Sequence, residues 1–210
     1  MTWFSLFFLI SLLICLASLG YHLLFLLRSG QTPDFAPPSG NIRAGILYSF
    51  TGAMSPVKKE SAFLHLPTYA AGMVYHLGTF ISILLIFLLW ADVVFPKALS
   101  LGIAAFLLAS ASCGTGILIK RSVKRNLRAL SNPDDYISNS LVTVFQLLTA
   151  LTLAFGSVFT PWLFVAAGLL LLYIPMGKLK HLLYFFAARC QLGLFFGRRG
   201  VWPPHKNQTP

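Results

Sequence analysis

The sequence predicts an all-α integral membrane protein, a bundle of five transmembrane helices with its N-terminus outside the cell and its C-terminus in the cytoplasm. Of its 210 residues, 57% are hydrophobic and only 10% are charged. A soluble domain carries roughly 25% charged residues. This composition excludes a soluble globular enzyme and a disordered chain. The apolar residues also gather in long runs, and the basic residues fall between alternate runs.

Five segments have the length and composition of bilayer crossings. A crossing needs about 20 mostly apolar residues, and a helix satisfies its own backbone hydrogen bonds there. The segments are Trp3 to Leu27, Leu66 to Trp90 with a continuation to Phe95 left open, Ala98 to Ile119, Ile137 to Val158, and Trp162 to Leu182. The first is expected to be a retained helix, because it is long and no basic residue precedes Arg28, unlike a cleaved signal peptide.

The basic residues predict the orientation. The formal net charge is +11, from 16 Lys and Arg against 5 Asp and Glu. All the basic residues except Lys97 lie in segment 28–65, in loop 120–136 or from Lys178 onward. The positive-inside rule places these three segments in the cytoplasm. The positive charge therefore indicates membrane topology and attraction to anionic lipids, and no nucleic-acid partner is expected.

The connections predict three domains. Residues 1–183 form the five-helix membrane domain, residues 184–202 an amphipathic segment at the membrane interface, and residues 203–210 a disordered tail. The interfacial segment mixes aromatic residues with arginines. In loop 120–136, Ser131 or Asn132 is expected to cap a helix that has Pro133 in its first turn and Asp134 and Asp135 at its positive dipole end.

Acid–base and metal chemistry have few candidate residues within the predicted crossings. The only carboxylates lie in loops or at helix ends: Asp34, Glu60, Asp92, Asp134 and Asp135. Proton-coupled transporters usually carry an acid inside the membrane, so a small transporter is disfavoured. The three cysteines form no CxxC pair that would bind zinc or an iron–sulfur cluster. Any such cluster must belong to a partner.

Two histidines are candidates for haem binding. His76 lies about ten residues into the second crossing and His181 at the inner end of the fifth, and Gly72 and Gly177 each precede one of them by about one turn. Such glycines leave room for a flat cofactor, and imidazoles from two facing helices can ligate one haem iron. The two depths nearly agree if the second helix continues to Phe95. Spacing alone also allows structural histidines bonded to carbonyls.

Four segments carry a resemblance that covers nearly the whole chain. They are residues 59–69, 75–80, 133–138 and 175–181, which include a His-x-Gly and a Pro-x-Gly-Lys-x-x-His motif. Together they resemble the gamma-subunit family of respiratory nitrate reductase. They are more similar still to its relatives that anchor heterodisulfide-reductase-like proteins and dissimilatory sulfur enzymes.

The resemblance implies one b haem. In the nitrate reductase form, helices two and five each carry two haem-ligating histidines. His76 matches one ligand in helix two and His181 one in helix five, for the haem nearer the cytoplasm. The other two positions fall near Ile86 and Leu163, which cannot ligate iron. Lys178 and Lys180 lie just before His181 and are candidate cofactor-binding residues, as partners of the haem propionates.

His65 and His22 carry three open interpretations. His65 lies eleven residues before His76, which places both on one helix face if the helix continues through Pro67. His22 lies at the inner end of the first crossing. The two histidines form a second haem site, contribute to a quinone pocket, or are interfacial residues with ordinary hydrogen bonds.

The resemblance implies a membrane haem b subunit in the cytoplasmic membrane of a prokaryote. It would transfer electrons between a quinone, expected to be menaquinone, and a cytoplasmic iron–sulfur oxidoreductase of the heterodisulfide-reductase type. It would therefore be the quinone-reactive subunit of a membrane oxidoreductase complex. The alternative is a haem-free anchor or assembly subunit of a respiratory complex.

Overall fold

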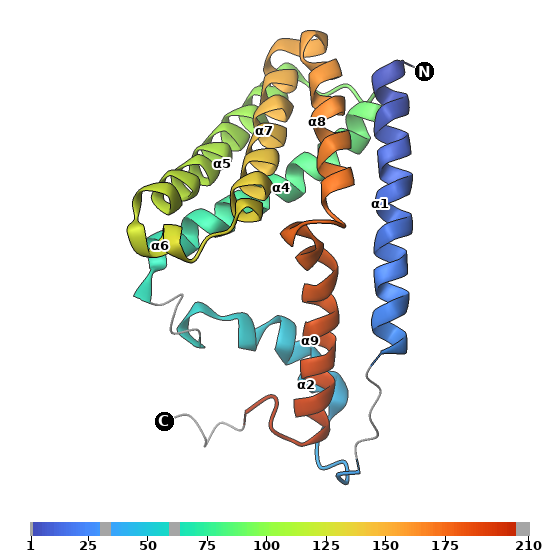
Figure 1. Ribbon diagram of the computed structural model, residues 1–210, viewed down its shortest axis with the longest axis vertical. Coiled ribbons are helices and arrows are strands. Elements are labelled where there is room, and N and C mark those ends of the chain that lie inside the picture. The colour runs from blue at the N-terminus through green and yellow to red at the C-terminus, as the bar shows by residue number, and fades with distance from the viewer. Residues whose placement is uncertain (1, 30–34, 59–63, 205–210) are drawn as a thin grey trace. The chain divides into compact units, whose positions relative to one another are not determined.

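The computed structural model describes residues 2–29, 35–58 and 64–204, and every regular element in these ranges is helical. The α-helices, labelled in Figure 1, are α1 (Trp3–Arg28), α2 (Ile42–Phe50), α4 (Leu66–Trp90), α5 (Lys97–Val123), α6 (Arg125–Ala129), α7 (Pro133–Phe155), α8 (Thr160–Tyr173) and α9 (His181–Arg198). Single 3-10 turns cover Gly52–Met54, Pro56–Lys58, Gly156–Val158 and Lys178–Lys180. Residues 205–210 of the predicted tail and residues 59–63 of the first quoted motif lie outside the described ranges.

The chain is a multi-pass membrane protein. Four helices are long and apolar enough to cross a bilayer: α1, α4, α5, and α7 together with its continuation to Val158. The first four predicted crossings are therefore confirmed as helices that are long and apolar enough to span a membrane. The α4 helix ends at Trp90, and Asp92 adopts a left-handed backbone with φ of 55°. The continuation of this helix to Phe95 is therefore wrong.

The fifth predicted crossing differs from the structure. A continuous helix from Trp162 to Leu182 is wrong, because α8 ends at Tyr173 and the next α-helix, α9, begins only at His181. Pro175 explains the break, since its ring removes a backbone donor and clashes with the preceding turn. At about 21 Å, α8 alone is shorter than the roughly 30 Å hydrocarbon core. The described residues thus contain four candidate membrane spans, or five if α8 and the helical stretch after it count together as one broken span.

The chain divides into two compact units. The first unit comprises Met1–Leu19 and Pro67–Leu179, and the second comprises Gly20–Leu66 and Lys180–Pro210. The first contains most of α1 together with α4 to α8. The second contains α2, α9 and the end of α1. This division is drawn differently from the sequence-based domains, and each unit is described by itself below.

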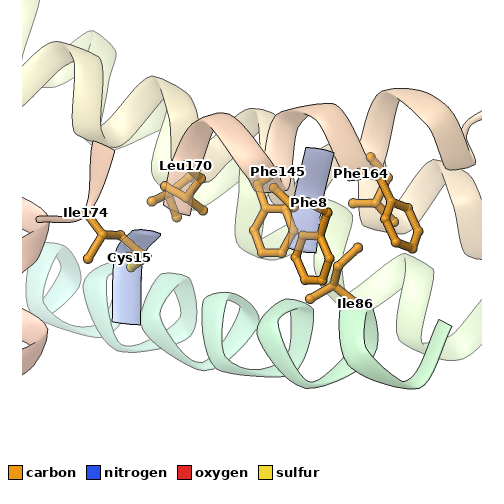
Figure 2. Packing of buried hydrophobic residues seen from close by; sticks show 10 residues of the cluster. Phe8, Cys15, Ile86, Phe145, Phe164, Leu170 and Ile174 are labelled. Atoms are coloured by element: carbon orange, nitrogen blue, oxygen red, sulfur yellow. The ribbon is translucent and has the colours of Figure 1, made fainter. Parts of the chain in front are cut away.

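An aromatic and aliphatic cluster forms the main core of the first unit. It joins α1, α4, α7 and α8, and Figure 2 shows Phe8, Phe145 and Ile86 packed together within it. The rings of Phe8 and Phe164 meet edge to face, with centroids 5.5 Å apart. This cluster holds four helices together through side-chain packing, the main source of helix association in a membrane.

A polar network joins α4, α5 and α7 inside the same unit. The Gln146 side-chain amide donates to the Tyr75 carbonyl at 3.0 Å and to the Thr79 hydroxyl at 2.7 Å. Gly78 is buried beside Ser110 and Gln146, and a β-carbon on it would overlap the Ser110 side chain. A glycine at this position allows close helix approach, as is common in membrane interfaces.

In the second unit, α2 lies against α9 through glycines (Figure 1). A β-carbon on Gly45 would meet the backbone of Gly193 and Gly197. The Phe50 and Phe186 rings stack beside this contact, with centroids 6.0 Å apart. The predicted interfacial segment 184–202 lies mostly in α9, whose packing partner α2 was not predicted.

Candidate functional site

His76 lies on an exposed face of α4, with its ring nitrogen Nδ1 2.7 Å from the carbonyl oxygen of Gly72. This geometry suits an Nδ1–H that donates to the carbonyl, so that the lone pair is on Nε2. Histidines that bind metals commonly donate their second ring N–H to such an acceptor. A β-carbon on Gly72 would meet nothing within 4 Å, so the space beside this glycine is open, and its role beside a cofactor stays a prediction.

His181 is the first residue of α9 and is exposed. It belongs to the second unit, whereas His76 belongs to the first. The pairing of the two histidines around one haem therefore stays a prediction. The depth estimate for His181 assumed a continuous fifth helix, and that assumption is wrong because α8 ends at Tyr173.

Gly177 has a different environment from Gly72. The 3-10 turn Lys178–Lys180 separates Gly177 from α9, so Gly177 and His181 do not share one continuous α-helix. A β-carbon on Gly177 would meet the ring of Tyr173 and the carboxylate of Asp134. Local packing therefore already requires a glycine here, and its role in cofactor binding stays a prediction.

Two carboxylates hold the chain at this break. Asp134 accepts hydrogen bonds from the Tyr173 hydroxyl and, at 2.7 Å, from the backbone N–H of Lys178. Asp135 lies 2.7 Å from the Lys178 ammonium and 3.2 Å from the Arg121 guanidinium. We call these five residues the aspartate clasp. It fixes the path of the chain up to Lys178, three residues before His181.

The start of α7 agrees with its prediction. The Asn132 side chain accepts from the backbone N–H of Asp135, and the Asp135 carboxylate accepts from the backbone N–H of Asn132. Pro133 occupies the first turn, as expected. The sequence did not reveal that Asp134 and Asp135 also contact Lys178, which follows α8. The Lys178 ammonium contacts Asp135, and its contact with a haem propionate stays a prediction.

The remaining cofactor candidates lie in the second unit. Lys180 is half-buried and directly precedes α9. His22 is half-buried in α1, and its Nδ1 lies 3.4 Å from the Tyr184 hydroxyl of α9, a partner that the sequence did not suggest. His65 is exposed and precedes the first residue of α4. Its alignment with His76 was predicted for a helix that continues through Pro67, and α4 does so, beginning at Leu66, one residue after His65.

The two positions without histidine lie in the core of the first unit. Ile86 is 3% exposed and Leu163 is fully buried, and both belong to the cluster of Figure 2. Protein side chains therefore fill the surroundings of Ile86 and Leu163, and the correspondence of these residues to outer-haem positions stays a prediction.

No group of three or more His, Cys, Asp or Glu side chains that could hold a metal ion occurs within residues 2–29, 35–58 and 64–204. A bis-histidine haem site requires only two protein ligands. Comparison of the chain with protein-family models, curated proteins and solved structures finds no match in any of the three.

Proposed function

We propose that this protein is a membrane cytochrome b subunit that transfers electrons between a quinone and a cytoplasmic iron–sulfur oxidoreductase. The observation that carries the proposal is the environment of His76. An ionisable ring in an apolar membrane helix is costly and usually functional. Here the 2.7 Å contact with the Gly72 carbonyl orients the ring, and the space beside Gly72 is open.

The residues around His76 fit one side of a haem. A bound haem supplies a one-electron couple, whose potential depends on the axial ligands and their surroundings. His76 would provide one axial nitrogen, Nε2, while the Gly72 carbonyl holds the proton on Nδ1. His181 would provide the second axial ligand. Lys180 is a better propionate candidate than Lys178, because the Lys178 ammonium contacts Asp135.

The proposal includes five crossings, with the N-terminus outside and the basic end in the cytoplasm. The broken span of α8 and α9 then forms the fifth crossing. Support comes from the basic residues, which lie almost entirely in three of the connections. The proposed location, the cytoplasmic membrane of a prokaryote, rests on the resemblance described above; quinones are dissolved in that bilayer.

The partner and the quinone rest on the resemblance described above. A heterodisulfide-reductase-like protein would dock at the cytoplasmic end. Lys124, Arg125 and Arg128 are exposed there around α6 and could attract an acidic face. The proposed quinone is menaquinone.

Spectroscopy of the purified protein tests the haem assignment. A reduced-minus-oxidised spectrum should show b-type absorption in the wild type and lose it in both His76→Ala and His181→Ala. His65→Ala is the matched control and should keep one haem per chain. A haem-to-protein ratio near two that falls in His65→Ala and His22→Ala would assign these histidines to a second haem. Folded wild-type protein that contains no haem, even when haem is supplied during expression, would contradict the haem assignment. It would favour the alternative, a haem-free anchor or assembly subunit.

A further inference from the structure

A cavity of about 230 Å³ lies between α4 and α5 near the basic end of α5. Its walls include Thr68 and Ala71 from α4 and Cys113, Gly116 and Lys120 from α5. All of these residues belong to the first unit, so the cavity lies within one compact part of the chain. The proposed haem ligands and the aspartate clasp are not among its lining residues.

Small side chains make the cavity possible. A β-carbon on Gly116 would meet nothing within 4 Å, and Ala71 faces the same space. Ile117 and Pro67 complete an apolar wall. One part of the cavity therefore offers a surface that suits a hydrocarbon chain.

The polar part of the cavity consists of Lys120 and Thr68. The Lys120 ammonium donates a hydrogen bond to the Thr68 hydroxyl oxygen. The hydroxyl keeps its own hydrogen for donation to another acceptor, and the ammonium has further hydrogens to donate. Lys120 is half-buried, and both ion pairs found among the described residues involve Asp135 rather than Lys120. Within residues 2–29, 35–58 and 64–204, no carboxylate pairs with Lys120, and a half-buried cation of this kind favours an anionic ligand.

We propose that this cavity binds the phosphate group of an anionic phospholipid. The phosphate would accept hydrogen bonds from Lys120 and Thr68, and part of an acyl chain would lie along Ala71 and Ile117. Basic pockets between transmembrane helices bind anionic lipid headgroups in this way. A quinone ring is less suitable, because its neutral carbonyls do not balance the charge of Lys120. The inference does not depend on the haem assignment.

The test compares spin-labelled phosphatidylglycerol with spin-labelled phosphatidylcholine around the full-length protein in nanodiscs. The immobilised fraction of the label should be larger for phosphatidylglycerol. In Lys120→Gln the affinity for this lipid should fall about fivefold, the contribution expected of one basic residue near the membrane surface. Thr68→Val should weaken it less, and Lys120→Arg should retain most of it. Circular dichroism confirms that each variant is folded.

Lys124→Gln is the matched control, because Lys124 lies one turn further along but does not line the cavity. Equal immobilisation of the two lipids would overturn the proposal, and so would an equal loss in Lys124→Gln and Lys120→Gln. Inorganic phosphate is tested by ³¹P line broadening. If the phosphate line broadens only when Lys120 is present, and the protein does not prefer phosphatidylglycerol over phosphatidylcholine, the cavity binds free phosphate rather than a lipid. Displacement of the label by a short-chain quinone would assign it to a quinone.

Discussion

The two units use different means to hold helices together. In the first unit, α4, α5 and α7 meet through side chains, with Gln146 bonded across to α4 and Gly78 covered by the Ser110 side chain. In the second unit, α2 and α9 meet backbone to backbone, with Gly45 against Gly193 and Gly197. Side chains can rotate away from an added group, whereas a helix backbone cannot. The second contact should therefore be less tolerant of change than the first.

The largest effect is expected at the glycine contact of the second unit. Gly45→Ala places a methyl group against the backbone of α9. We expect a destabilisation of about 3 kcal/mol, near the upper end of overpacking effects. Hydrogen exchange of the α2 amides should accelerate strongly. Gly20→Ala is the control, because a β-carbon there meets nothing within 4 Å. If the α2 amides of Gly45→Ala still exchange slowly, the backbones of α2 and α9 can move apart without a loss of stability.

A smaller effect is expected at the equivalent position of the first unit. Gly78→Ala pushes against the Ser110 and Gln146 side chains, which can change rotamer. We expect a loss of about 1–2 kcal/mol, measured as a lower midpoint of thermal unfolding in detergent. Gly102→Ala in α5 has open space at its β-carbon and should not lower the midpoint. A loss in Gly78→Ala that exceeds the loss in Gly45→Ala would contradict the comparison between the units.

The aspartate clasp gives an effect that depends on salt. Asp135→Asn removes the charge that contacts Lys178 and Arg121, side chains that are 49% and 34% exposed. Partly exposed ion pairs contribute about 0.5–1 kcal/mol. The unfolding midpoint should fall at low ionic strength, and the difference from the wild type should narrow at high salt. A difference that does not change with salt would show that hydrogen bonding, rather than charge, holds the break after α8.

The smallest effect is expected from the buried amide. Gln146→Leu removes two hydrogen bonds to α4, and it also removes a side-chain oxygen that is buried without a partner. Hydrogen bonds between membrane helices average about 0.6 kcal/mol. We expect a loss of this size in reversible unfolding, with Thr149→Val as a control that breaks only a bond within α7. A loss several times larger would make the polar network the main determinant of packing in the first unit.

Hydropathy and length predicted the four continuous crossings because each depends on a local run of apolar residues. The break after Tyr173 also has a local signal in Pro175 and Gly177. The same two residues also belong to the Pro-x-Gly-Lys-x-x-His motif, and the apolar run around them predicts a continuous helix. Hydropathy did not reveal α2 as a helix, since it has nine residues and is held by glycines of a segment far along the chain.

The candidate site was predicted less completely than the fold. The position of Gly72 one turn before His76 follows from helical geometry, whereas the open space beside Gly72 depends on which segments pack there. The contacts of Lys178 with Asp135 and of His22 with Tyr184 join residues 43 and 162 positions apart. Contacts of this kind depend on how the chain folds back, which the spacing of residues along one helix does not specify.

The aspartate clasp has a consequence for the order in which the protein is made. The partners of Asp134 follow it by 39 and 44 residues, so they leave the ribosome after α7. Asp135 can pair with Arg121 as soon as α7 emerges, because that partner precedes it in the chain. Domains and segments generally fold from the N-terminus during synthesis. The first unit can therefore assemble through α7 with one carboxylate already paired, and the last turn of α8 and Lys178 then dock onto a prepared acceptor.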